Sequence, residues 1–536
     1  MNRTGLPRAA VIASLSIAAL NLALTFENAW PTPFPRPTMS ISVELAVIVL
    51  IMAVAGRRAA RLGWASIAAL TAAVLLLVHG RYLHVTALGL FGRPVDLYWD
   101  LRHVPRVLEM SAGMVPGWLL SVGAAAVVLW NVILMLGLYA AARGLARGMA
   151  WRPIRAGAAG LAGVTLLAAA GWHAVSAPGG RSAFATPVVS AYLESMNDLA
   201  VELTGGDAAM ARPHVDLPPS DLNGLGGRDV FVVFVESYGA VAIESGPDAP
   251  PVSVAIAGLD DELSADGWRA ASAFVESPTV GGASWLAHAS LLAGRTIDGH
   301  RAYEAMLARP TETLASRFAA AGYRTVGLFP GIRSDWPEGA AYRFDDVFVA
   351  ADLDYAGPAF GRWAVPDQFS MDWLWRTAVE PTNRAPVFAM MATIMSHFPF
   401  APVPPYQPDW DRLATAAPFD AAPTGGPAMA DAGWAGLGAS YAESIAYSLE
   451  WLGGFLQSRA PKDALVIVVG DHQPAAVVTG PGATRSVPVH VIARDPAALR
   501  PFLDGGFRPG LLPARPSLGP MRLLTVLILR GFDESS

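Results

Sequence analysis

Five apolar segments fill the first third of the chain and restrict its fold more than any other feature. Hydrophobic residues make up 53% of the 536 residues and charged residues only 15%. That composition is too apolar for a wholly soluble protein and indicates membrane spans. The segments are Ala9–Leu24, Ile41–Ala55, Ala65–Val78, Gly117–Ala141 and Ala156–Val175. We predict about five transmembrane helices within residues 1–176, and a re-entrant or tilted segment is the alternative for the third.

Basic residues give the predicted orientation of these helices. Arginines cluster before the first segment, between the second and third, and between the fourth and fifth. All of these clusters fall on one side if the amino terminus is cytoplasmic, as the positive-inside rule favours. An odd number of spans then places everything after about Ala177 outside the cytoplasm. Arg3 and Arg8 also fit a signal peptide, but no clear cleavage site follows, so we expect the first segment to be retained.

Two connecting regions differ from the spans in composition. Residues 91–116 mix aromatic and aliphatic residues with charges, as a segment in the membrane interface does, and a plain connector is an equal alternative. Residues 177–227 are rich in Pro, Gly and Asp, with a possible helix at Val188–Leu203. We interpret residues 177–227 as a linker to a second domain.

Residues 228–536 alternate strand and helix patterns, which predicts an α/β domain with a mostly parallel sheet flanked by helices. The predicted strands are Asp229–Val235, Ala270–Val275, Thr325–Phe329, Val387–Ile394, Ala464–Val469 and Val487–Ala493. The predicted helices include Pro251–Asp266, Ser284–Ala293, Thr311–Ala321, Tyr441–Arg459 and Met521–Leu529. Residues 402–438, rich in Pro, Ala and Asp, are predicted to form a long surface loop.

Acidic and imidazole side chains follow two of these strands. Asp471 and His472 come after Val466–Gly470, and Glu236 comes after Asp229–Val235. Ligand sites of open α/β sheets lie at the carboxyl ends of strands, and carboxylate and imidazole suit a divalent metal. A turn, a helix cap or a hydrogen-bonded loop histidine is the plainer alternative for each residue alone.

Ser284 opens a predicted helix after a turn that contains Gly281 and Gly282. Serine at a helix start is usually an N-cap. The positive end of the helix dipole also favours negative charge there, and a hydroxyl that touched a metal could act as a nucleophile. The spacing is not the Gly-x-Ser-x-Gly elbow of the α/β-hydrolases, and nothing else in the sequence supports a Ser-His-Asp triad.

Taken together, these residues resemble the alkaline phosphatase/sulfatase superfamily: Glu236 after the first strand, Ser284 after a glycine turn, and a late Gly-Asp-His. Five spans before an external catalytic domain resemble its membrane-bound phosphoglycerol transferase branch, typified by lipoteichoic acid synthase. Further segments that resemble family elements are Phe329–Asp345, Trp363–Gln368, Met395–Phe400 and Tyr441–Tyr447.

The resemblance implies roles for particular residues. One divalent metal, with manganese favoured and zinc or magnesium possible, would be held by Glu236, Ser284, Asp471 and His472, with Ser284 as the nucleophile. His397 would contact the substrate phosphate or head group. Arg333 and Trp336 would line the head-group pocket, and a solvated arginine and a packed tryptophan are their alternatives. The phosphoglycerol branch usually has Thr at the position of Ser284 and the Arg and Trp in the opposite order.

The function implied is a membrane-anchored phosphotransferase of a bacterial-type inner (cell) membrane, with its catalytic domain outside the cytoplasm. It would move a phospho-head group, with phosphoglycerol favoured, from a membrane phospholipid to a glycan or lipid acceptor through a phospho-serine. The alternatives are a phosphoethanolamine transferase, a sulfatase or phosphodiesterase, and a non-catalytic binding protein. The net charge of −6 gives no nucleic-acid signal. The absence of cysteine excludes the disulfides usual in lipid A-modifying members, and Ser284-Trp-Leu-Ala does not match a sulfatase signature.

Overall fold

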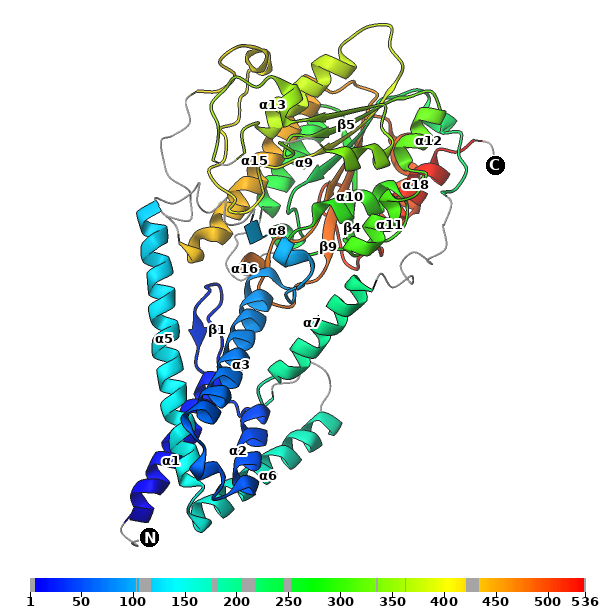
Figure 1. Ribbon diagram of the computed structural model, residues 1–536. Coiled ribbons are helices and arrows are strands. Elements are labelled where there is room, and N and C mark those ends of the chain that lie inside the picture. Colours follow the sequence, from blue (N-terminus) through cyan, green and yellow to red (C-terminus); the bar gives the residue numbers. More distant parts are fainter. Residues whose placement is uncertain are drawn as a thin grey trace. The chain divides into compact units, whose positions relative to one another are not determined.

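The chain forms two compact units, shown in the computed structural model of Figure 1. The first comprises Met1–Gly89 and Arg93–Gly206, and the second comprises Leu90–Gly92 and Asp207–Ser536. Each unit has a hydrophobic core. The structure describes residues 5–102, 104–105, 117–175, 182–204, 217–244, 252–333, 336–361, 363–420 and 433–534. Residues 103 and 106–116 of the predicted interfacial segment 91–116, and residues 421–432 of the predicted loop 402–438, lie outside the described residues.

The first unit is helical, with helices at all five predicted apolar segments. They are α1 (Gly5–Thr25), α2 (Val43–Ala55), α3 (Trp64–Phe91), α5 (Gly117–Gly148) and α6 (Arg152–Val175), and α7 (Val188–Leu203) follows. Among the described residues, α1, α3, α5 and α6 are long and apolar enough to cross a membrane. The 13-residue α2 is about 20 Å long, less than the roughly 30 Å of a bilayer core. The short helix is therefore the second, whereas we expected the third segment to be the weakest.

Small residues let two of these helices approach closely. α1 packs against α5, and a Cβ added at Gly144 would lie 2.5 Å from Ser16 Oγ. A Cβ at Gly148 would lie 2.9 Å from the Cβ of Ala13. Membrane helices depend on this kind of close packing, because lipid supplies no hydrophobic drive between them. A short hairpin of β1 (Glu27–Asn28) and β2 (Pro35–Arg36) follows α1.

The second unit is built on an eight-stranded sheet with the order β10-β4-β9-β8-β3-β7-β5-β6. The strands are β3 (Val230–Val235), β4 (Arg269–Glu276), β5 (Arg324–Phe329), β6 (Asp346–Val349), β7 (Val387–Ala392), β8 (Leu465–Gly470), β9 (Ser486–Ala493) and β10 (Arg508–Pro509). Strands β8, β3, β7, β5 and β6 are parallel to one another, and β9 is antiparallel to β8 and β4. The mostly parallel α/β fold is confirmed, and β6 and β10 were not predicted.

Helices cover both faces of this sheet (Figure 1). Phe231, Val233 and Val235 of β3 belong to one core with α9 (Ser253–Ala265), α13 (Asp367–Leu374) and α15 (Leu437–Ser458). The intervening β3 residues belong to a second core with α10 (Ser284–Leu292), α12 (Leu314–Ala320), α17 (Pro496–Asp504) and α18 (Leu523–Gly531). A strand buried on both faces is continuously apolar, as β3 is. The shorter helices are α8 (Val241–Glu244), α11 (His300–Leu307) and α16 (Ala476–Thr479).

Gly470, the last residue of β8, offers a stability test. A Cβ there would lie 1.8 Å from the carbonyl oxygen of Tyr238, so Gly470→Ala must displace backbone. We expect the free energy of unfolding to fall by about 2 kcal/mol or more, measured by thermal unfolding of the full chain in detergent. The control is Gly258→Ala in α9, where an added Cβ meets nothing within 4 Å; removing a helical glycine there should stabilise by up to about 1 kcal/mol. Equal melting temperatures for the two variants would contradict this packing.

Candidate active site

The pairing of β3 with β8 brings the predicted acidic residues together. The two strands are parallel, with Val235 opposite Gly470, so Glu236 and Asp471 both leave the same edge of the sheet. Glu236, Asp471 and His472 are 5%, 1% and 2% exposed. One potential ligand atom from each lies within 4.8 Å of those of the other two. Nε2 of His472 lies 3.6 Å from Glu236 Oε1 and 3.5 Å from Asp471 Oδ2. Two ligand atoms that are each about 2.0–2.2 Å from a shared ion lie at most about 4.4 Å apart, so these separations fit a common ion.

Ser284 lies against the same group. It is the first residue of α10, and the preceding Ala283 is the N-cap residue, with a φ of 61°. The Ser284 hydroxyl makes no capping hydrogen bond; it donates to Glu236 Oε2 at 3.0 Å and lies 3.1 Å from Nε2 of His472. The structure therefore brings Glu236, Ser284, Asp471 and His472 together, and it does not support the interpretation of the Ser284 side chain as a helix cap.

Hydrogen bonds to Asp471, Glu236 and His472 determine which of their atoms remain available to bind an ion. Asp471 Oδ1 accepts from the backbone N–H groups of Ser237 at 2.7 Å and His472 at 2.6 Å, so Oδ2 is not used by them. Glu236 Oε1 accepts from the Ser237 hydroxyl at 2.8 Å. His472 Nδ1 donates to the carbonyl of Gln473 at 2.8 Å, which leaves the Nε2 lone pair available to bind a metal.

The electrostatics of the site favour a bound cation. Burial opposes the charge on Glu236, but His472 and His397 lower the pKa of that carboxyl to about 2. Burial and the charge of Glu236 raise the pKa of Asp471. Burial also lowers the pKa of His472, which keeps its imidazole neutral. Two adjacent buried carboxyls resist ionising together unless a positive charge joins them. The donor set of two carboxylates, an imidazole and a hydroxyl fits a divalent ion such as manganese, zinc or magnesium.

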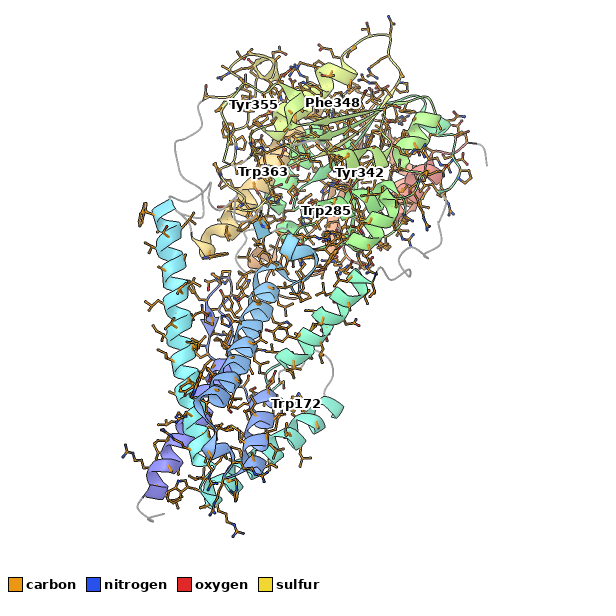
Figure 2. All side chains as sticks on the ribbon, in the orientation of Figure 1. Trp172, Trp285, Tyr342, Phe348, Tyr355 and Trp363 are labelled. Carbon is orange, nitrogen blue, oxygen red and sulfur yellow. The ribbon has the colours of Figure 1, made fainter. Side chains whose placement is uncertain are left out.

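His397 lies on the segment that follows β7, the strand on the other side of β3 from β8. The backbone N–H of Glu236 donates to Thr393 Oγ1 at 2.9 Å, and the Ser396 hydroxyl donates to the carbonyl of Glu236 at 2.6 Å. These bonds fasten the segment after β7 to the end of β3. The His397 Nδ1 donates to the carbonyl of Phe398 at 2.8 Å, so its Nε2 can accept a hydrogen bond. Its ring packs edge-on against Trp363 at 5.0 Å, which Figure 2 labels.

Asp367 holds the segment after β7 through two hydrogen bonds to its backbone. Its fully buried carboxylate accepts from the backbone N–H groups of Ile394 and Met395, each at 2.9 Å. Burial raises the pKa of Asp367 to about 7, although both hydrogen bonds act to lower it. The sequence pattern Pro366-Asp367-Gln368 resembles a family element but gave no sign of this role. Asp367 thus holds the backbone that leads to His397.

Arg333 and Trp336, which we predict to line the head-group pocket, follow the end of β5 (Arg324–Phe329). Arg333 is exposed. Trp336 is half-buried and packs against Phe329 at 4.6 Å and Tyr342 at 5.3 Å; Figure 2 labels Tyr342 near Trp285, whose carbonyl it contacts. Among the described residues, no hydrogen bond or ion pair joins Arg333 or Trp336 to Glu236, Asp471 or His472. These ring contacts are compatible both with a pocket-lining Trp336 and with a packed tryptophan, so the role of each residue stays a prediction.

Two residues of the site were missed by the sequence analysis. Ser237 adopts a φ of 57°, and this backbone conformation accompanies its contacts to both carboxylates. His288 lies one turn after Ser284, is 8% exposed and packs against Phe234 at 4.6 Å. Burial lowers the pKa of His288 to about 3. The four-residue spacing from Ser284 could have indicated His288, whereas nothing in the sequence indicates the conformation of Ser237.

The comparisons with known proteins gave matches among solved structures only. No family model and no curated protein matches the chain. The integral membrane lipooligosaccharide phosphoethanolamine transferase A from Neisseria meningitidis is similar at 15% identity and a TM-score of 0.41, covering 85% of this chain and 88% of that one. The lipoteichoic acid synthase LtaP from Listeria monocytogenes is similar at 13% identity and a TM-score of 0.37, covering 61% and 78%. The Streptococcus pyogenes phosphoglycerol transferase GacH is similar at 11% identity and a TM-score of 0.34, covering 56% and 74%.

Metal binding can be tested on the full chain. Asp471→Asn removes one ligand charge, so we expect affinity for Mn²⁺ or Zn²⁺ to fall by about 100-fold or more, since even outer partners of metal ligands contribute 10–100-fold. Titration calorimetry and metal content after desalting measure this. A chelator should also lower the melting temperature of the unaltered chain more than that of the variant. The exposed Asp504→Asn is the charge-matched control. Equal affinities in the two variants would remove Asp471 from the site.

The raised pKa of Asp367 predicts a pH dependence. The folded-state pKa of about 7 exceeds the unfolded value of roughly 3.9, so the unfolded chain releases its proton first as the pH rises. This contribution to stability is complete below about pH 4 and is lost as the pH rises through about 7. Melting temperatures between pH 4.5 and 7.5 should therefore fall less in Asp367→Asn than in the unaltered chain. An equal or steeper fall in the variant would show that Asp367 is ionised throughout.

Proposed function

We propose that the chain is a metal-dependent, membrane-anchored phosphotransferase that acts on a lipid donor. The observation that carries this proposal is the Ser284 hydroxyl, which lies 3.0 Å from Glu236 Oε2 and 3.1 Å from His472 Nε2. A serine beside a buried carboxylate pair and a neutral imidazole can lose its proton to a neighbour and attack an electrophile. The four apolar helices long enough to span a membrane favour a donor that resides in the bilayer.

The position of Ser284 on α10 favours a phosphoryl substrate over an uncharged one. The first turn of a helix carries backbone N–H groups without helical partners and the positive end of the helix dipole. Both favour an anion at Ser284, where a phosphate must lie for attack. In its doubly protonated form, His397 adds a hydrogen-bond donor for the phosphate, Nε2–H, while its Nδ1–H stays bonded to the carbonyl of Phe398.

The proposed reaction has two displacements at phosphorus. In the first, a bond forms between Ser284 Oγ and the phosphorus while the bond from phosphorus to the diacylglycerol oxygen breaks. The proton of the hydroxyl passes to a neighbouring base, and the leaving oxygen takes up a proton. Our candidate donor is Nε2–H of His397 in its doubly protonated form, in which Nδ1–H keeps its bond to the carbonyl of Phe398. In the second, a hydroxyl of a glycan or lipid acceptor attacks the phospho-serine, and Ser284 Oγ leaves and regains a proton.

The side chains around Ser284 have distinct roles in this scheme. A divalent ion held by Glu236, Asp471, His472 and Ser284 would lower the pKa of the hydroxyl and offset charge on the phosphoryl oxygens. Ser237 and the carbonyl of Gln473 orient three of these ligands through the hydrogen bonds described above. The phosphoryl group would then meet a nucleophile whose direction is fixed before the substrate arrives.

The finer assignments belong to the same proposal. We favour phosphoglycerol as the head group and manganese as the ion, with phosphoethanolamine and zinc as the nearest alternatives. We place the transmembrane domain at residues 1–176, a linker at 177–227 and the catalytic domain at 228–536. The catalytic domain would lie outside the cytoplasm of a multi-pass inner-membrane protein, where lipid donors and cell-envelope glycans meet.

The covalent step can be tested by intact-mass analysis. Full-length protein in detergent is incubated with Mn²⁺ or Zn²⁺ and with either phosphatidylglycerol or phosphatidylethanolamine. We expect a metal-dependent mass increase that is absent in Ser284→Ala and retained in Ser284→Thr, because threonine keeps the hydroxyl. The mass increase identifies the head group. Release of free head group by the folded, metal-loaded chain without any adduct would show that direct hydrolysis replaces the proposed transfer. If this chain neither consumes nor forms an adduct with either lipid, the proposed class of lipid donor is wrong.

A further inference from the structure

The helix α7 of the first unit has two chemically distinct faces. Val189, Leu193, Met196 and Leu203 recur at helical spacing and are 45%, 65%, 60% and 69% exposed. Residues three, four and seven apart lie on one side of a helix, so these side chains form a single apolar stripe. Acidic residues lie elsewhere on the helix, at a four-residue spacing: Glu194, Asp198 and Glu202. An exposed stripe of this length is a surface that something apolar covers.

Contacts within the first unit fix the start of α7. The backbone N–H of Val188 donates to the carboxylate of Glu44, and Glu44 lies in the first turn of α2. The buried guanidinium of Arg81 donates to the carbonyl of Thr186 at 3.1 Å and to that of Phe26 at 2.9 Å. These bonds tie the chain just before and at the beginning of α7 to α2, α3 and the end of α1.

Tyr192 then packs α7 against α3. Its hydroxyl donates to the carbonyl of Leu76 at 2.8 Å. A Cβ added at Gly80 would lie 2.3 Å from the Tyr192 hydroxyl oxygen, so this approach requires a glycine. The side of α7 that carries Val188 and Tyr192 therefore faces the helices, and the apolar stripe adjoins that side, roughly 80° further around the helix axis.

The position of the Tyr192 contact along α3 indicates how deep in the membrane α7 begins. At 1.5 Å per residue, the 28-residue α3 is roughly 42 Å long, which exceeds the roughly 30 Å core of a bilayer. Leu76 and Gly80 lie about 18 and 24 Å from its first residue, Trp64. With the apolar core beginning near Trp64, the contact with Tyr192 lies in the half of the membrane remote from Trp64. His79 and Arg81 follow the apolar segment Ala65–Val78 at this level of α3, so α7 begins where the apolar part of α3 ends.

We propose that α7 lies in the bilayer interface on that side, with Val189, Leu193, Met196 and Leu203 inserted among the lipid chains. Lipid is the occupant we favour because the neighbouring α3 exposes Leu76 and Leu83 at 62% and 53%, a surface that a membrane helix presents to lipid. The stripe is continuous with it through the Tyr192 contact. α7 contains no Lys or Arg, so its binding rests on apolar burial, without attraction to anionic head groups.

The inference about α7 does not depend on the proposed phosphotransferase activity, so each can fail alone.

The absence of cysteine makes a direct test possible. The single-cysteine variants Met196→Cys and Asp198→Cys of the full chain are labelled with bimane. The labelled proteins are then reconstituted into phosphatidylcholine vesicles. Brominated lipid quenches probes among the acyl chains, and aqueous iodide quenches probes in water. We expect bromolipid to quench the Met196 probe at least about twofold more than the Asp198 probe, with iodide giving the reverse order. Leu193→Cys and Glu194→Cys form a second pair with the same expectation.

Two results would overturn the proposal. Iodide quenching of the Met196 and Leu193 probes as strong as that of the Asp198 and Glu194 probes would place the stripe in water. Protection of the stripe probes from both quenchers would show that protein, such as a second copy or the second unit, covers it. Circular dichroism and thermal unfolding of each labelled protein establish that the fold is kept, and the two cysteine pairs guard against a single unfolded variant.

Discussion

The site depends first on the in-register pairing of β3 with β8. Val235 lies opposite Gly470, and the next residue of each strand is a carboxylate. A slip of one residue would turn these side chains to opposite faces of the sheet and separate Glu236 from Asp471. A side-chain hydrogen bond also joins the two segments just beyond the strands, since Asp471 Oδ1 accepts from the backbone N–H of Ser237. The close approach of Tyr238 to Gly470 leaves no room for a side chain there, so a glycine precedes the Asp-His pair for a steric reason.

Two residues beside the site have a strained backbone. Ser237 and Ala283 have φ values of 57° and 61°, a region in which a residue with a side chain costs about 1–3 kcal/mol. Both lie next to a proposed ligand, Glu236 and Ser284 respectively. At Ser237 the strained backbone directs its N–H to Asp471 and its hydroxyl to Glu236. At Ala283 the turn starts α10 so that the hydroxyl of Ser284 is free of capping. The hydrogen bonds and the packed sheet maintain these conformations, and the result is a nucleophile aligned with its neighbours.

The sequence predicts the parts of the molecule that repeat a simple pattern. Buried strands such as β3 and β8 are continuously apolar and end in glycine or charge, so their positions and the carboxylates after them could be recognised. The antiparallel direction of β9 could not be predicted from the sequence, because its residues are as apolar as those of a parallel strand. The strand β6 has only four residues, too few to show the alternation of apolar and polar residues by which a strand is recognised. Asp367 and Ser237 act through backbone N–H groups of residues distant in sequence, and such partners follow only from the fold. Trp336 was predicted from family resemblance alone, and its neighbours Phe329 and Tyr342 are packing partners.

The arrangement of donors and acceptors explains why a cation would complete this site. The Ser284 hydroxyl has one proton, yet it faces both Glu236 Oε2 and the unprotonated Nε2 of His472, with the buried Asp471 carboxyl beside them. Without a positive charge, these acceptors compete for a single proton, and burial makes the competition costly. A divalent ion would satisfy them together and would leave the hydroxyl oxygen as a further ligand. Because the outer hydrogen bonds of Asp471, Glu236 and His472 are already made, binding would need little rearrangement, and its free energy would add directly to the stability of the folded chain.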